Sequence, residues 1–107
     1  SKIIADRLVE AFSEKMHEMV RKDLWGYSKN ESLSIRDMIK EKYYGIRPAP
    51  GYPACPNHQH KDYIWQMLDV EKNTGITLTE TRSMFPAASL SGWYFSNPKS
   101  KYFVIGS

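Results

Sequence analysis

Hydrophobic side chains recur at steps of three and four residues between positions 4 and 20, which is the spacing of one face of an α-helix. Glu10 lies about 200° round such a helix from Leu8 and from Phe12, because each residue turns the helix by about 100°. The pattern therefore predicts a helix over residues 4–20 with an apolar face and with Glu10 as a solvated surface carboxylate. The apolar positions are Ala5, Leu8, Val9, Phe12, Met16, Met19 and Val20.

A second helix is predicted after Gly26, which can end the first helix in the left-handed conformation. Ser34 and Asp37 have the spacing of a capping box, in which each side chain accepts a hydrogen bond from a free backbone donor at the helix start. Gly45 is expected to stop this helix. The predicted buried stripe consists of Ile35, Met38, Ile39 and Tyr43.

A third helix is predicted over residues 57–74. Asn57 can cap its first turn, and Gly75 follows its last residue. Its apolar positions include Ile64, Met67 and Leu68.

The period of the pattern then changes from helical to extended. Residues 76–80, 89–96 and 101–105 are rich in threonine, aromatic and β-branched side chains, which favour strands. The last two segments flank the turn at residues 97–100, so they predict a β-hairpin to which the first segment pairs. The expected fold class is α+β, with helices packed on a small antiparallel β-sheet in a single domain over residues 1–107.

The segment Arg-Pro-Ala-Pro-Gly-Tyr-Pro-Ala-Cys-Pro at residues 47–56 cannot form a regular helix or a central strand. Its four prolines fix φ near about −65° and remove four backbone donors. The segment is therefore predicted to be a stiff, extended loop whose remaining polar backbone groups need partners from water, the fold or a ligand. Arg47 and Tyr52 add a cation and an aromatic ring, a combination that suits a polar molecule with a carboxylate and a flat ring. A rigid turn that binds nothing is the simpler alternative.

Composition and charge narrow the classes of partner. The formal net charge is +3, but residues 1–46 hold nine Lys/Arg against eight Asp/Glu, without the basic stripe that nucleic-acid binding uses. No apolar run reaches the length needed to cross a bilayer, and no signal peptide is found. The lone Cys55 cannot form an internal disulfide, which favours the cytoplasm. We therefore expect a small-molecule ligand, with neither nucleic acid nor membrane as partner.

Metal binding and nucleophilic catalysis are weakly indicated. Cys55, His58 and His60 contain ligand types that zinc prefers, but the spacing is poor and a fourth ligand is not evident. Cys55 lies between prolines, and only His17, on another predicted helix, could serve it as a base. Gly-rich phosphate loops and hydrolase elbows are absent from the sequence. We expect no metal site and no catalytic side chain.

The proline loop resembles the signature of the activation domain of cobalamin-dependent methionine synthase, which binds S-adenosylmethionine (AdoMet). Further similar motifs occur in the family's order over nearly the whole chain. They are Ala5-Asp6-Arg7-Leu8, Glu10-Ala11-Phe12, Trp25-Gly26-Tyr27, Thr79-Glu80, Ser91-Gly92-Trp93-Tyr94-Phe95-Ser96 and Ser100-Lys101-Tyr102-Phe103.

The resemblance implies a set of AdoMet-binding residues. Arg47 would meet the methionyl carboxylate, and the backbone at Ala49, Gly51 and Tyr52 would approach the ligand closely. Tyr102 and Phe103 match a tyrosine pair of the family, in which Phe103 lacks one hydroxyl. If this pair stood in a strand, its side chains would alternate, so at most one would face the groove squarely. The resemblance also places Glu10 among the polar residues that face the AdoMet groove.

The resemblance further implies a role that needs partners. The domain would present AdoMet to a cobalamin held by another module of methionine synthase, for reductive methylation of inactive cob(II)alamin with a flavodoxin-like or other flavoprotein electron donor. The family's domain is longer than this chain and has an upstream aspartate at the AdoMet site, so we expect a partial domain, either trimmed or naturally short. An alternative is a non-catalytic interaction module that docks on a corrinoid protein or a flavodoxin-like donor.

Overall fold

The computed structural model describes residues 2–103, and its first element is a long helix that confirms the first prediction. Helix α1 (Lys2–Met19) continues into a π-helical turn, η1 (Val20–Leu24). Gly26 follows with φ of 75°, the left-handed conformation expected at a helix end. Within residues 2–103 no helix is long and apolar enough to span a membrane.

Helix α2 (Ile35–Ile39) begins at the predicted capping box but does not bury the predicted stripe. The Ser34 hydroxyl accepts from the Asp37 backbone N–H at 3.1 Å, and the Asp37 carboxylate accepts from the Ser34 N–H at 3.4 Å. Ile35 and Ile39 are 74% and 75% exposed, so the stripe is wrong at these two positions. The helix is too short to present one continuous face, because Glu41 adopts φ of 57° and turns the chain before the buried Tyr43.

The third predicted helix is divided into three pieces. Asn57 caps the 3₁₀ turn η2 (His58–His60), because its side-chain oxygen accepts from the Gln59 N–H at 2.9 Å. The predicted cap is thus confirmed. Helix α3 (Lys61–Leu68) follows, and α4 (Val70–Thr74) ends at Gly75. Asp69, with φ of 48°, separates the two helices, which a helical sequence period does not reveal.

The sheet is smaller than predicted and pairs different residues. Strands β1 (Thr77–Leu78) and β2 (Met84–Phe85) are antiparallel, with Thr77 opposite Phe85. The predicted hairpin between residues 89–96 and 101–105 is wrong over residues 89–103, and residues 104–105 lie outside the described part of the chain.

Residues 93–95 pair instead with the beginning of the proline loop. Phe95 and Ile46 exchange two backbone hydrogen bonds of 2.9 Å, and the Trp93 N–H donates to the Pro48 carbonyl at 2.9 Å. The loop's prolines cannot donate, so they accept from a strand-like neighbour without extending a regular ladder. This long-range pairing took the place of the local hairpin.

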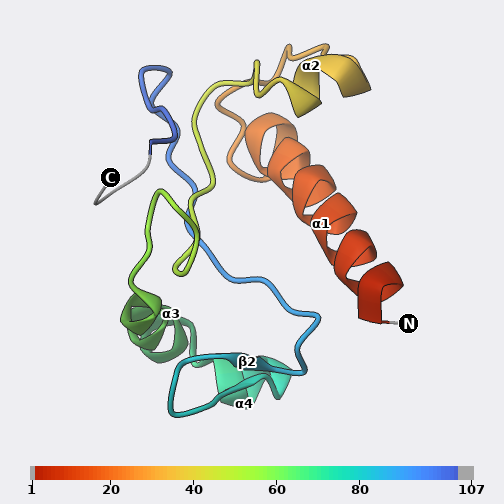
Figure 1. Cartoon of the computed structure of the whole chain (residues 1–107). Helices are drawn as coiled ribbons and strands as arrows, with labels where there is room; N and C mark the ends of the chain where they lie inside the picture. The colour runs from red at the N-terminus through yellow and green to blue at the C-terminus, as the bar shows by residue number, and fades with distance from the viewer. Residues whose placement is uncertain (1, 104–107) are drawn as a thin grey trace.

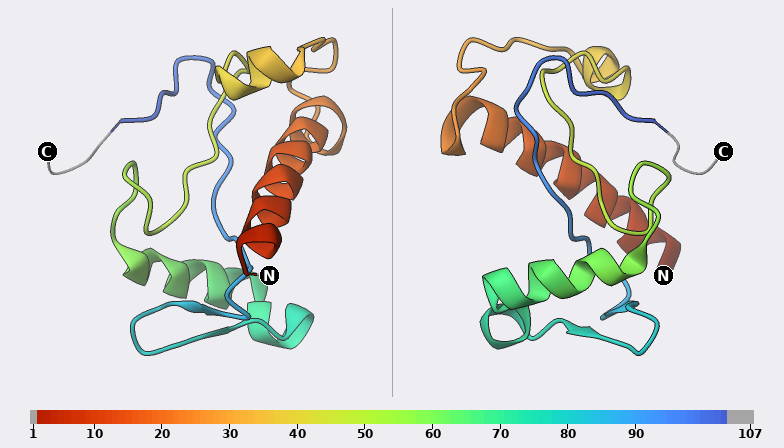
Figure 2. Two further views of the ribbon diagram at one scale, coloured as in Figure 1. Left: turned by 45° about the vertical axis from the view of Figure 1, so that its right-hand side comes forward. Right: turned by 90° about the vertical axis from the view of Figure 1, so that its left-hand side faces the viewer.

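The two paired segments run through the middle of the molecule between α1 on one side and α3 on the other (Figure 1). Two further views show α2 near one end of the molecule and the α3, α4 and β-strand region near the other (Figure 2). The buried hydrophobic side chains are Val20, Tyr43, Ile46, Ile64 and Val70.

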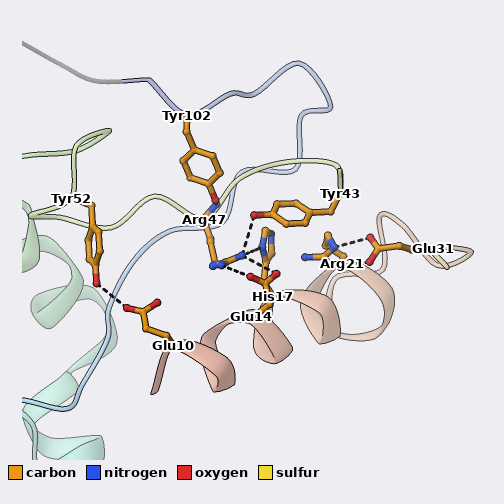
Figure 3. A network of polar contacts seen from close by, with 9 residues as sticks. All are labelled: Glu10, Glu14, His17, Arg21, Glu31, Tyr43, Arg47, Tyr52 and Tyr102. Atoms are coloured by element: carbon orange, nitrogen blue, oxygen red, sulfur yellow. Dashed lines mark hydrogen bonds and ion pairs between the residues drawn. The ribbon is translucent and has the colours of Figure 1, made fainter. Parts of the chain in front are cut away.

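The apolar face of α1 is not the most deeply buried face of the helix. Leu8 and Phe12 are 65% and 63% exposed, whereas His17 and Arg21 are fully buried. The predicted apolar face over residues 4–20 is therefore only partly buried. Val20 is buried and Ala5, Val9 and Met16 are half-buried, whereas Leu8, Phe12 and Met19 are exposed. Polar residues of α1 instead face the chain between Tyr43 and Tyr52 (Figure 3).

Candidate ligand-binding groove

An open groove of about 880 Å³ lies between α1, the proline loop and the segment at residues 88–94. Tyr102 and Phe103 close one part of its wall. Most of the lining is apolar or aromatic, and its few charged groups are Glu10, Glu41 and Arg47. A large concave site with a small number of polar groups is typical of small-molecule binding. The apolar and aromatic lining residues are Leu8, Val9, Phe12, Met16, Tyr43, Pro48, Ala49, Tyr52, Pro53, Ala54, Ile76, Ala88, Leu90, Trp93, Tyr94, Tyr102 and Phe103.

Arg47 forms an ion pair with the carboxylate of Glu14 on α1. Its Nη2 donates to Glu14 Oε2 at 2.6 Å, and its Nη1 donates to Glu14 Oε1 at 3.3 Å. Although burial lowers the pKa of Arg47, the hydrogen bonds and charge of Glu14 raise it above the ordinary value. The guanidinium is therefore a permanent cation at the wall of the groove.

Two further groups accept from Nη1 of Arg47, as Figure 3 shows: His17 Nδ1 at 2.9 Å and the Tyr43 hydroxyl at 3.1 Å. Because an arginine can only donate, His17 must accept at Nδ1 and carry its proton on Nε2. Burial, with the charges of Arg21 and Arg47, lowers the pKa of His17 to about 3. The imidazole is thus neutral at physiological pH.

A second arginine lies behind this group. Arg21 donates from Nε and Nη2 to the two carboxylate oxygens of Glu31 at 2.7 and 2.8 Å, and both side chains are buried. Its Cζ lies 4.3 Å from the centroid of the Tyr43 ring, whose hydroxyl contacts Arg47. Burial, followed by hydrogen bonding to Tyr102, raises the pKa of Tyr43. Tyr43 therefore remains a neutral phenol between two guanidinium groups.

Glu10 and Tyr52 meet across the other part of the groove. The Tyr52 hydroxyl donates to Glu10 Oε1 at 3.2 Å, which connects α1 to the proline loop (Figure 3). Burial and the nearby charge of Glu10 raise the pKa of Tyr52. Glu10 is thus an exposed carboxylate, as its position on the helix predicted, and it also lies at the groove, where the family resemblance places it.

The structure brings six of the seven residues predicted from the resemblance to one groove. They are Glu10, Arg47, Ala49, Tyr52, Tyr102 and Phe103. The last two both line the groove, and they do not belong to a strand in the described part of the chain, so the alternation expected of a strand does not apply.

Gly51 is not among the lining residues. It has φ of 98°, and its N–H donates to the Cys55 carbonyl at 2.7 Å, which turns the loop at Tyr52. A Cβ at this position would clash with the His58 ring. The glycine of close approach is Gly92, where a Cβ would lie 2.7 Å from the Pro48 carbonyl.

Sequence reasoning missed Glu14 and His17 as the partners of Arg47. Together with Glu10 and Arg21 they follow at steps of four, three and four residues, so they share one face of a helix within about 60°. This polar stripe lies beside the apolar positions and could have been found by asking which polar residues repeat with the helical period.

The histidines near Cys55 make local contacts. Cys55 Sγ lies 3.3 Å from His60 Nδ1, and His58 Nδ1 lies 3.1 Å from the Lys61 amine. Over residues 2–103 no group of three or more metal-ligating side chains comes together.

Comparison with known proteins assigns the chain to a family. Residues 1–107 match the family described as the activation domain of vitamin B12 dependent methionine synthase. The chain belongs to this family. The resemblance carried by the proline loop and its companion motifs is therefore confirmed, and so is the α+β fold class.

A solved structure supports the assignment. The crystal structure of the MetH reactivation domain bound to AdoHcy is 61% identical, with a TM-score of 0.91. The match covers 96% of this chain and 32% of that one, so this activation-domain chain spans about a third of the length of the solved structure.

Proposed function

We propose that the groove binds AdoMet and that the chain presents it to a cobalamin held by another module of methionine synthase. The observation that carries this proposal is the position of Arg47. Its guanidinium lies at the wall of a groove whose remaining lining is mainly apolar and aromatic. The family assignment and the AdoHcy bound to the similar solved structure support the same ligand class, since AdoHcy is AdoMet without its transferable methyl group.

The groove fits such a ligand in size and in chemistry. Its volume of about 880 Å³ is within the range of about 300–1,000 Å³ that small-molecule sites occupy. AdoMet carries a carboxylate, an ammonium, a sulfonium and a flat adenine ring. Arg47 suits the carboxylate, Glu10 suits a positive group, and the aromatic walls at Trp93 and Tyr102 suit the ring.

The chain's own task is to bind and orient the ligand. AdoMet supplies a methyl group to reduced cobalt when both partners are present. Among the described lining residues there is no thiol, imidazole or amine, so the groove offers no strong nucleophile for that methyl group. The rigid loop, the backbone at Ala49 and the turn at Gly51 hold the wall in place.

The proposal requires two partners. One is the cobalamin-binding module, and the other is a flavodoxin-like or flavoprotein donor that supplies one electron. The free thiol of Cys55 is consistent with a location in the reducing cytoplasm.

A methyl-transfer assay tests the proposal. The chain is mixed with AdoMet labelled in its methyl group, a cobalamin-bearing module in the cob(II)alamin state and a one-electron reductant. Label should reach the corrinoid only when all components are present. Labelling of the chain itself, or transfer without cobalamin, would contradict the proposal.

A further inference from the structure

The hydrogen bonds of Arg47 leave one edge of its guanidinium unused. An arginine has five N–H donors, arranged as an end fork at Nη1 and Nη2 and a side fork at Nε and Nη2. Glu14 occupies the end fork, and His17 and Tyr43 accept further from Nη1. Within residues 2–103, Nε of Arg47 makes no hydrogen bond. The side fork is therefore available for a second carboxylate.

His17 is built into the protein in a way that suits an acceptor for Arg47. It is fully buried, and its ring packs edge-on against Tyr43, with centroids 4.7 Å apart, and at a tilt of 32° against Tyr94, with centroids 5.3 Å apart. These contacts prevent the imidazole from turning away from Arg47. Its other nitrogen, Nε2, is buried without a hydrogen-bond partner among the described residues. Such an unsatisfied group lowers the free energy of unfolding, so the contacts of the ring must offset this loss.

Burial first, and then the charges around it, lower the pKa of His17 and keep the imidazole neutral. Arg21 and Arg47 lie on either side, and each disfavours an imidazolium. Glu31 binds Arg21 and Glu14 binds Arg47, so each carboxylate is already engaged and neither contacts the imidazole. A neutral His17 can accept from Nη1, whereas a protonated one would repel the guanidinium.

We propose that His17 is a positioning residue for Arg47: with Glu14 and Tyr43 it fixes the end of the guanidinium so that the side fork faces a carboxylate in the groove. This inference rests on the proposed binding of AdoMet for its ligand. Without the acceptor at His17, the guanidinium loses one of the contacts that set its rotation and can swing to pair with Glu14 through its side fork. The ligand carboxylate would then meet an arginine that is already occupied.

Binding of AdoMet and of decarboxylated AdoMet, compared in His17 variants, distinguishes a role in positioning Arg47 from general damage to the groove. His17→Phe removes the acceptor and keeps a ring, whereas His17→Asn keeps an acceptor close to the position of Nδ1. Against AdoMet, His17→Phe should weaken binding at least about 10-fold, and His17→Asn should recover most of the loss. For decarboxylated AdoMet, which lacks the carboxylate, the affinities of the unmodified chain and of the two variants should agree within about 2-fold. Equal losses for both ligands in His17→Phe would overturn the positioning role.

A second measurement needs no ligand. In ¹⁵N NMR spectra of the ligand-free chain, slow rotation about the Cζ–Nη bonds should give separate Nη signals for Arg47 and averaged signals for the exposed Arg36. His17→Phe should average the Arg47 signals, and His17→Asn should keep them separate. Averaged Arg47 signals in the unmodified chain would overturn the inference. If that chain bound neither ligand, the proposed function would fail, and the NMR result would still decide the role of His17.

Discussion

The hydroxyl of Tyr102 accepts a hydrogen bond from the backbone N–H of Arg47 at 2.7 Å, across 55 positions of sequence. This contact connects the end of the described chain to the first residue of the proline loop (Figure 3). Residues 48–56 have few donors of their own, so the loop depends on such contacts for its position. Tyr102 thus orients the backbone of the residue whose side chain we propose as the ligand anchor.

Removal of the Tyr102 hydroxyl should destabilise the fold. Tyr102→Phe leaves the part-buried N–H of Arg47 without its acceptor, a loss expected to cost about 1–3 kcal/mol in the free energy of unfolding. Urea denaturation measures this cost. Tyr63→Phe is the control, because Tyr63 is exposed and its hydroxyl makes no hydrogen bond with the described residues. Equal effects of the two substitutions would show that the Tyr102 contact contributes nothing.

The buried pair of Arg21 and Glu31 should be far more sensitive to substitution than a surface pair. Glu31→Gln leaves the buried guanidinium without a counter-charge, which should lower the free energy of unfolding by about 3–5 kcal/mol. Glu18→Gln breaks the exposed contact with Lys15 and should cost under about 1 kcal/mol. Thermal and urea unfolding of both variants compare the costs, and similar values would contradict the burial argument.

Helix starts were predictable because their signals are local. Ser34 with Asp37 and the side chain of Asn57 cap the first turns of their helices from within three residues, so the sequence alone contains the interaction. The irregular proline loop was also predictable, since proline acts on its own backbone regardless of tertiary context. Its extended course is wrong over residues 50–55, where hydrogen bonds among Ala49, Gly51, Tyr52 and Cys55 fold the chain into a turn. The binding role of Arg47 stays a prediction.

Pairings between distant segments were not predictable in the same way. The extended residues near Phe95 could pair with a neighbouring strand or with Ile46, and only the folded chain decides between them. The same holds for α1 and η1, where the fully buried side chains are those of His17 and Arg21, which contact Tyr43, while the apolar Leu8 and Phe12 are exposed. A polar stripe that finds buried partners can occupy the interior as an apolar one does.

Stability should depend on pH through His17. In the folded chain its pKa is lowered to about 3, from an ordinary value of 6.5, so only the unfolded chain binds a proton there between these pH values. The free energy of unfolding should therefore rise with pH over this window, by up to about 1.4 kcal/mol per pH unit from this residue. Urea titrations from pH 4 to pH 7 should show a steeper rise in the unmodified chain than in His17→Asn. Parallel curves would contradict a neutral, buried His17.

Gly45 should tolerate a side chain less well than Gly75 does. Both have positive φ, at 82° and 77°, so each alanine substitution carries a backbone cost of about 1–2 kcal/mol. A Cβ at Gly45 would also clash with the Phe95 carbonyl, beside the bridge between Ile46 and Phe95. A Cβ at Gly75 would have no atom of the described residues within 4 Å. Gly45→Ala should therefore lose at least about 1–3 kcal/mol more in urea denaturation. Equal losses would mean that the approach of the two segments is not tight.

The most direct test of the central claim is isothermal titration of the chain with AdoHcy. We expect saturable binding of one equivalent, competition by AdoMet, and a loss of about 2–4 kcal/mol in binding free energy for Arg47→Ala. Arg36→Ala, which removes an exposed arginine outside the groove, should bind as the unmodified chain does. Absence of binding to the unmodified chain, or equal affinities for Arg47→Ala and Arg36→Ala, would contradict the claim that this groove holds the ligand through Arg47.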